Sequence, residues 1–139
     1  SYYEMPKLDI KPSYNPVYNI TKDTIRMPPL EQFESSEEYY ATLFHELIHS
    51  TGHNTRLNRL TGGRKGEEKA IEELVGEIGS AYLSFDSNIL DKVVDNNAAY
   101  IDYWIERIDK NPRLFISATS KAEKAYSFIQ SHSVLKEAV

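Results

Sequence analysis

The sequence of 139 residues predicts a small α+β domain in which an N-terminal antiparallel β-hairpin precedes about four helices. Five of the six prolines fall within the first 33 residues, where they exclude a helix and favour extended segments. From residue 35 onward, apolar side chains recur at helical spacing. Because 40% of the residues are hydrophobic and 27% are charged, we expect one soluble domain over residues 1–139.

The hairpin is expected from two extended segments, Tyr14–Ile20 and Thr24–Met27, which flank the short polar stretch Thr21–Asp23. Prolines stand only at the ends of these segments, where they remove no ladder hydrogen bond. The pair Pro28 and Pro29 ends the strand pairing.

A helix over residues 38–51 follows. Ser35 is the expected N-cap, and Glu38 three residues later completes a capping box. Gly52 is the expected stop after the last turn. The buried stripe of this helix is expected to consist of Tyr40, Leu43, Phe44, Leu47 and Ile48.

A second helix is predicted over residues 67–85, with Phe85 as the last residue of its apolar face. Gly76 and Gly79 lie in its interior. Because each glycine costs a helix up to about 1 kcal/mol relative to alanine, we expect a close approach there. The approaching group is another backbone or a ligand, or else the two helices simply pack closely.

Two more helices complete the predicted fold. Residues 95–108 carry inward-facing apolar side chains at helical spacing, and Asn111 followed by Pro112 is typical of an N-cap and first helical residue. The last helix carries Phe115, Ala118, Ala122, Ala125 and Ile129 on one face. The segment after Ser131 has little pattern.

The first helix contains the pentapeptide H-E-x-x-H at residues 45–49. Four residues advance a helix by little more than one turn, so His45 and His49 project from one face and can share a zinc ion. Glu46 stands beside that face and can reach a water at the metal without being a ligand. That is the position of a hydrolytic general base. In the absence of cysteine, any metal must be held by histidine and carboxylate.

A catalytic zinc site usually has three protein ligands, and the second helix offers the third. Glu73 and Glu77 stand four residues apart on one face beside the helix glycines. One of them is expected to bind the metal, with Glu73 favoured, while the other hydrogen-bonds the outer nitrogen of a ligand histidine. His53 is the alternative ligand, although it falls two residues short of the third histidine in the longer H-E-x-x-H-x-x-G-x-x-H motif.

Charge and composition exclude several classes of function. The formal net charge of −5 argues against direct nucleic-acid binding by this domain. The one basic cluster comprises Arg56, Arg59, Arg64 and Lys65, and is either a set of solvated loop charges or an anchor for substrate. No apolar run is long enough to span a bilayer and the N-terminus does not resemble a signal peptide, so we expect a cytoplasmic protein without membrane contact.

Three longer stretches of sequence resemble the zincin-like metallopeptidase domain of ArdC-type antirestriction proteins from plasmids and other mobile elements. They are residues 39–53, the Arg-Leu-Asn-Arg run at residues 56–59, and Glu-Glu-Leu-Val-Gly-Glu-Ile at residues 72–78. The resemblance spans nearly the whole chain. It implies a zincin fold, with a small twisted sheet packed on helices and the metal between the H-E-x-x-H helix and the helix that follows.

By comparison with the related gluzincins, the resemblance implies that Glu73 is a metal ligand. It implies that Glu77 does not bind the metal itself but supports a residue that does. Zinc is the expected metal, with manganese as an alternative. Proteins of the ArdC type also carry an N-terminal domain that binds single-stranded DNA. This chain resembles the peptidase portion alone, so we expect such a DNA-binding domain to precede it in a longer protein.

The sequence therefore predicts a zinc-dependent peptidase in an antirestriction or mobile-element context, acting on a peptide or protein substrate. Glu46 would accept a proton from water and return it to the leaving amine. An extended substrate would pair with the outer strand of the hairpin. The alternative hypothesis is a metal-stabilised interaction module that inhibits a host restriction enzyme or another partner without proteolysis. The sequence singles out no residue that stabilises the oxyanion.

Overall fold

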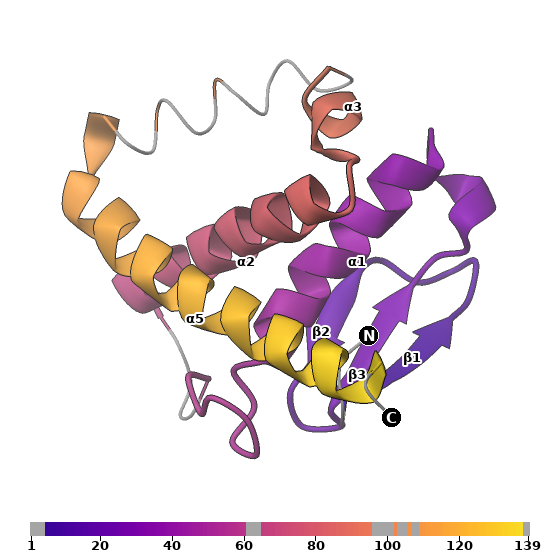
Figure 1. Cartoon of the computed structure of the whole chain (residues 1–139), viewed down its shortest axis with the longest axis horizontal. Helices are drawn as coiled ribbons and strands as arrows, with labels where there is room; N and C mark the ends of the chain where they lie inside the picture. The colour runs from indigo at the N-terminus through magenta and orange to yellow at the C-terminus, as the bar shows by residue number, and fades with distance from the viewer. Residues whose placement is uncertain (1–4, 61–64, 96–101, 103–105, 107–108, 138–139) are drawn as a thin grey trace.

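The computed structural model describes residues 5–60, 65–95, 102, 106 and 109–137. It confirms the α+β class, with a small sheet beside a group of helices (Figure 1). The strands are β1 (Lys7–Ile10), β2 (Val17–Asn19) and β3 (Thr24–Met27). A short 3-10 helix, η1 (Leu30–Gln32), leads from the sheet into the first α-helix.

The sheet confirms the predicted hairpin and adds a strand. β2 pairs antiparallel with β3, with Tyr18 opposite Ile25. β1 was not predicted, and it pairs parallel with β3 in the order β1-β3-β2. The sheet is therefore mixed, and the expectation of an antiparallel sheet was wrong in this respect. As a result, β2 forms one edge of the sheet.

The helices are α1 (Ser36–Ser50), α2 (Glu67–Asp86), α3 (Leu90–Asp95) and α5 (Pro112–Glu137). The predicted N-cap of α1 is confirmed, because the Ser35 hydroxyl accepts a hydrogen bond from the Glu38 backbone N–H at 3.2 Å. The Asn111 side chain accepts one from the Leu114 backbone N–H in the same way at 3.3 Å. The predicted helix over residues 95–108 falls largely outside the described residues.

Three details of the helices differ from what the sequence pattern suggests. Residues 132–137 continue α5, although the segment after Ser131 has little pattern. Tyr39 is buried in place of Tyr40, and Leu83 is buried where Phe85 is exposed. In each pair, the helix is rotated slightly from the orientation that apolar spacing alone suggests.

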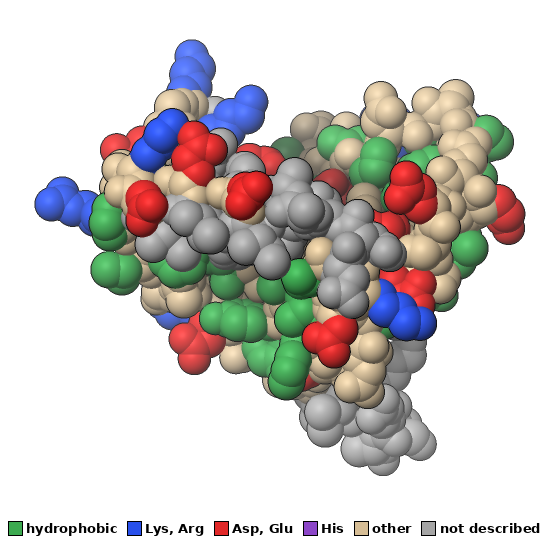
Figure 2. Space-filling view, turned by 90° about the horizontal axis from the view of Figure 1, so that it is seen from above, with side chains coloured by type: hydrophobic (Ala, Val, Ile, Leu, Met, Phe, Trp, Pro, Cys, Tyr) green, Lys and Arg blue, Asp and Glu red, His purple; other side chains and the backbone are tan. Residues whose placement is uncertain are grey.

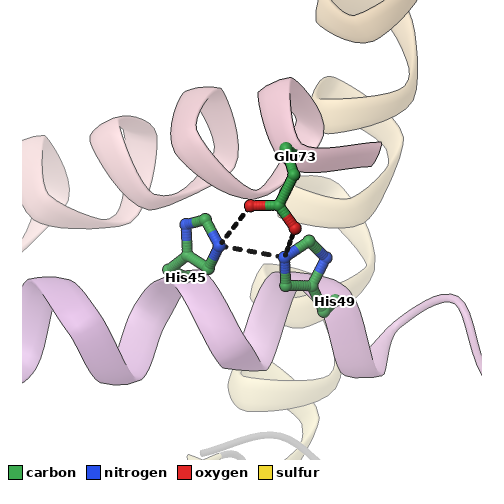
Figure 3. A group of neighbouring side chains, drawn as sticks. All are labelled: His45, His49 and Glu73. Carbon is green, nitrogen blue, oxygen red and sulfur yellow. Dashed lines mark hydrogen bonds and ion pairs between the residues drawn. The ribbon is translucent and has the colours of Figure 1, made fainter. Parts of the chain in front are cut away.

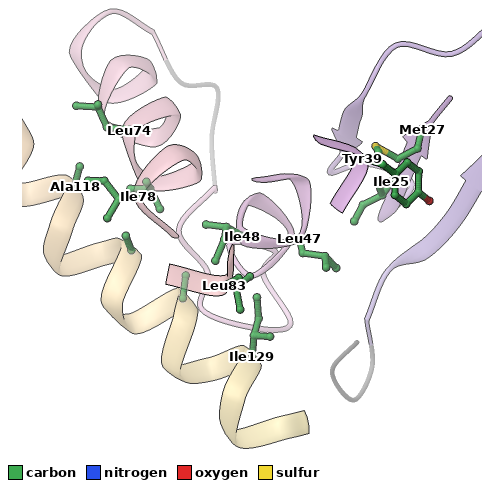
Figure 4. Packing of buried hydrophobic residues seen from close by; sticks show 13 residues of the cluster. Ile25, Met27, Tyr39, Leu47, Ile48, Leu74, Ile78, Leu83, Ala118 and Ile129 are labelled. Carbon is green, nitrogen blue, oxygen red and sulfur yellow. The ribbon is translucent and has the colours of Figure 1, made fainter. Parts of the chain in front are cut away.

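α1 lies between the sheet and α2, and α5 packs along α2 (Figure 1). The hydrophobic core follows this order, with Ile25 and Met27 from β3, Leu47 and Ile48 from α1, and alanines of α5 on the far side (Figure 4). Because Ala118, Ala122 and Ala125 are fully buried, α5 can approach α2 closely. α1 is thus held on two sides, which fixes the direction of its polar face.

Seen from above, acidic and basic side chains are interspersed among the side chains drawn in colour, without a continuous basic surface (Figure 2). In the described part of the chain, no helix is both long enough and apolar enough to cross a membrane.

Candidate metal and active site

α1 directs His45 and His49 toward α2 from successive turns. Their Nε2 atoms lie 2.9 Å apart, and the two rings meet at an interplanar angle of 78°. Glu73 faces both rings from α2, with one carboxylate oxygen 3.7 Å from His45 Nε2 and the other 3.7 Å from His49 Nε2 (Figure 3). Donor atoms of the three residues all lie within 4.8 Å of one another, which is the size of a metal site.

Gly76 makes room for this cluster. A Cβ atom at that position would lie 2.8 Å from both His45 Cε1 and His49 Nε2. Gly79 has the same effect one turn later, where a Cβ would lie 2.6 Å from the Ile48 side chain. The approaching groups are therefore side chains of α1, and neither a backbone nor a ligand is needed to explain the glycines.

His49 is supported by Glu72, a residue for which sequence reasoning proposed no role. The Nδ1 atom of His49 lies 3.0 Å from Glu72 Oε1, and the Glu72 side chain is only 8% exposed. Burial by itself would raise the pKa of Glu72, but hydrogen bonds from His49 and Arg59 outweigh it and lower the pKa to about 2. An ionised carboxylate only accepts hydrogen bonds, so Nδ1 of His49 carries the proton and Nε2 presents a lone pair.

Arg59 holds Glu72 in turn. Its Nε and Nη2 donate to the two carboxylate oxygens at 2.8 and 2.9 Å, while further hydrogen bonds reach the Ile48 carbonyl and the Thr51 hydroxyl, each at 3.0 Å. This two-pronged pairing is the geometry in which a guanidinium recognises a carboxylate most specifically. The position of His49 is thus fixed through a hydrogen-bonded chain that returns to α1 itself.

His45 has a similar but more open support. Its Nδ1 lies 3.1 Å from Glu77 Oε1, and the Glu77 side chain is 31% exposed. Burial would lower the pKa of His45, yet its contacts with Glu73 and Glu77 outweigh burial and raise the pKa to about 10. The site therefore attracts positive charge. The structure thus places Glu77 against the outer nitrogen of His45, and its role beside a metal ligand stays a prediction.

Glu46 is buried beside the two histidines. Burial raises the pKa of its carboxyl, while the nearby histidines and a hydrogen bond from the Tyr18 backbone oppose the rise. A cleft of about 1050 Å³ opens over this residue. One wall of the cleft is formed by the edge strand and the hairpin turn, with Val17 and Ile20 among the lining residues.

His53 also lines the cleft but does not join the cluster of donor atoms. Its Nδ1 lies 2.8 Å from the hydroxyl of Thr55, which is exposed, and His53 itself is half-buried. The sequence offers Tyr39, Tyr40, Tyr82 and His53 as possible donors to the oxyanion. Of these four, His53 alone lines the cleft, and Tyr18 lines it as well.

Neither interpretation of the basic cluster holds for its first two members. Arg56 and Arg59 have side chains only 3% and 8% exposed, and both are ion-paired within the domain, with Asp23 and Glu72 respectively. They are therefore neither solvated charges nor free anchors for substrate. The pairing could not be found from composition, but Glu72 stands one helical turn before Gly76, on the face that approaches α1. Arg64 lies outside the described residues.

A family model described as a zincin-like metallopeptidase matches residues 7–121. The chain belongs to the zincin-like metallopeptidase family. The model covers the sheet, α1 and α2, and so includes every residue of the cluster.

Relatives and solved structures agree with this family. Crystal structures of the antirestriction protein ArdC from the R388 plasmid, one Mn(II)-bound and one metal-free, superpose with TM-scores of 0.72 and 0.71 at 35% identity. A DNA primase TraC of Escherichia coli is 38% identical over 113 residues, and the uncharacterized protein y4eC of Sinorhizobium fredii is 34% identical over 108 residues. The resemblance to ArdC-type proteins is thereby confirmed.

The matched region is a part of each relative. The region aligned with Mn(II)-bound ArdC includes 91% of this chain but 48% of the ArdC chain. The region aligned with the TraC primase includes 81% of this chain and 11% of the primase. The region aligned with y4eC includes 77% of this chain and 35% of y4eC.

Proposed function

We propose that this domain is a zinc-dependent peptidase, with manganese as an alternative metal. One observation carries the proposal. The outer nitrogens of His45 and His49 face carboxylates, so their two inner nitrogens point at each other, 2.9 Å apart, and at Glu73. Despite burial, the neighbouring carboxylates favour a proton on His45 and raise its pKa to about 10, and a metal cation can take the place of that proton between the two nitrogens. The donor set of two imidazoles and one carboxylate is that of a catalytic zinc site.

The residues that would hold the ion are His45, His49 and Glu73. When bound, zinc acts as a Lewis acid and lowers the pKa of water to about 7. Glu46 accepts the proton of the attacking water at its carboxylate and then donates it to the leaving amine. A buried carboxylate with a raised pKa is suited to this exchange, because it accepts the proton of water more readily than an ordinary carboxylate does.

The edge strand supports a peptide as the substrate. β2 pairs only with β3 among the described strands, and its other side faces the cleft, where the Tyr18 backbone reaches Glu46. An extended peptide can add to such an edge through main-chain hydrogen bonds, which places its carbonyl groups over the site. The ArdC neighbours are named as antirestriction proteins, and we propose that the substrate is a host protein that such an activity opposes.

The test compares wild type with Glu46→Gln, which preserves the shape of the side chain but cannot accept a proton. We expect both proteins to bind zinc stoichiometrically by elemental analysis, and only the wild type to hydrolyse peptides from a library. Hydrolysis by the variant would remove Glu46 from its role as base. Absence of any metal after purification and dialysis against zinc would contradict the metal site itself.

The same open edge also favours a second candidate, a metal-stabilised module that inhibits a partner by binding. Val17 and Ile20 are 44% and 38% exposed beside the site, as a protein-binding edge requires. This candidate predicts that wild type and Glu46→Gln inhibit a restriction enzyme equally and leave it uncleaved. Inhibition that depends on Glu46, with cleavage fragments detected by mass spectrometry, decides for the peptidase.

A further inference from the structure

A hydrogen-bonded chain joins the edge strand to the end of α1. The Tyr18 hydroxyl donates to Asp23 Oδ1 at 2.7 Å, and Arg56 donates to the two Asp23 oxygens at 2.8 Å each. Arg56 also donates to the Ser50 carbonyl at 3.0 Å. Ser50 is the last residue of α1 and directly follows His49. The chain therefore connects the cleft wall to the helix that carries the site.

The position of β2 matters because this strand reaches the candidate base. The Tyr18 backbone lies within hydrogen-bonding reach of Glu46, and its side chain lines the cleft. Yet β2 is only three residues long and lies at the sheet edge. A short edge strand with one neighbour is held weakly by its ladder alone. Something beyond the ladder must fix its distance from α1.

Asp23 can fix this distance, because it contacts both Tyr18 of β2 and Arg56. It lies in the hairpin turn with φ 50°, a left-handed conformation that only aspartate, asparagine and glycine adopt at low cost. The conformation turns its carboxylate toward Arg56, whose side chain is 3% exposed. A charge-assisted, two-pronged pair restricts both distance and orientation, whereas a single hydrogen bond would restrict only distance.

We propose that Asp23 and Arg56 are positioning residues that hold β2 against Glu46, so that an extended peptide can pair with the strand over the site. The second half of this proposal rests on the proposed peptidase function. The first half, the fixed position of the strand, can be tested without any catalysis.

The decisive variant is Asp23→Asn. Asparagine also tolerates the left-handed conformation, so the change removes the charge while the turn is kept. Arg56→Lys keeps the positive charge but cannot donate to both Asp23 oxygens in the same two-pronged geometry. Tyr18→Phe removes only the hydroxyl that donates to Asp23. Lys92→Gln is the matched control, because it breaks an exposed ion pair with Glu37 that does not line the cleft.

In Asp23→Asn and Arg56→Lys we expect KM for extended peptides to rise about tenfold, with kcat within about twofold of wild type. Zinc affinity should be unchanged, and amide hydrogen exchange at Tyr18 and Asn19 should accelerate. The control should alter none of these. A loss of thermal stability with unchanged KM and unchanged exchange would overturn the proposal, because the pair would then be merely structural. If Arg56→Lys does not fold, Asp23→Asn and Tyr18→Phe still decide.

Failure of the proposed peptidase function would be recognised separately, as an inactive wild type that binds zinc. In that case, hydrogen exchange alone decides the positioning of the strand. Faster exchange in Asp23→Asn than in Lys92→Gln supports it, and equal exchange overturns it.

Discussion

The two histidines of the cluster belong to one helix, yet the protein supports them differently. His49 contacts a carboxylate that is 8% exposed and held by Arg59, while His45 contacts Glu77, which is 31% exposed. Behind His49, hydrogen bonds from Arg59 return to the backbone of α1. Among the described residues, Glu77 pairs with His45 alone.

We therefore expect the two supports to contribute differently to the stability of the fold and to metal affinity. The chain behind His49 is part of the buried structure, so its loss should reduce both stability and metal affinity. The contact behind His45 lies near solvent, so its loss should affect the metal and little else. Variants at these positions would test this expectation, and the largest effect is expected at Glu73, which faces both histidines.

Glu73→Ala should have the largest effect on metal affinity, because Glu73 is the third member of the cluster and faces both rings. We expect a loss greater than about 100-fold, which exceeds the usual cost of removing a supporting residue. His53→Ala is the matched variant and should change affinity little. Zinc titration against a chelating indicator measures both. Near-normal affinity in Glu73→Ala with lost binding in His53→Ala would move the third ligand to His53.

Glu72→Ala should be the next most damaging variant. It leaves the Arg59 guanidinium buried without its carboxylate, and removing one partner of a buried pair typically costs about 3 to 5 kcal/mol of unfolding free energy. It also frees the His49 ring, which should lower zinc affinity about 10 to 100-fold. Urea denaturation and zinc titration give the two values. Undiminished stability would show that His49 is not fixed by the fold.

Gly76→Ala should weaken metal binding because its Cβ would lie 2.8 Å from both rings. Gly79→Ala is the matched control, since its Cβ would meet only Ile48. Overpacking of this kind costs about 1 to 3 kcal/mol, so both variants should lose stability in denaturation curves. Only Gly76→Ala should lose zinc affinity as well. Equal affinities in the two variants would mean that the rings can move aside freely.

Glu77→Gln should have the smallest effect. The amide can still accept a hydrogen bond from His45, so we expect zinc affinity to fall by about tenfold at most, with no measurable change in unfolding free energy. Isothermal titration and urea denaturation provide the measurements. A stability loss as large as that of Glu72→Ala would abolish the distinction between the two histidines.

Sequence reasoning could predict the parts of the fold that depend on local pattern. The capped helix of H-E-x-x-H, the glycine-bearing second helix and the hairpin each follow from residues within one or two turns of one another. β1 could not be predicted in the same way, because its parallel partner β3 is 17 positions away in register, from Lys7 to Thr24. Such pairing depends on tertiary contacts that no local pattern records.

The candidate site shows the same limit. His45, His49, Glu73 and Glu77 follow from helical spacing, and the structure places them together. Arg59 donates to Glu72 across 13 residues of sequence, and Arg56 donates to Asp23 across 33. From sequence alone, an arginine in a loop is expected to be exposed to solvent. Only the tertiary structure shows that a carboxylate far away in the sequence pairs with it.

Glu73 differs from both histidines in one respect, since its side chain is 55% exposed. The imidazoles are only 16% and 11% exposed between α1 and α2, whereas a solvent-facing glutamate can rotate away within nanoseconds. We therefore expect an ion at this site to enter and leave past Glu73, without local unfolding. Exchange with a chelator should then be fast even under conditions in which the helices remain closed to hydrogen exchange.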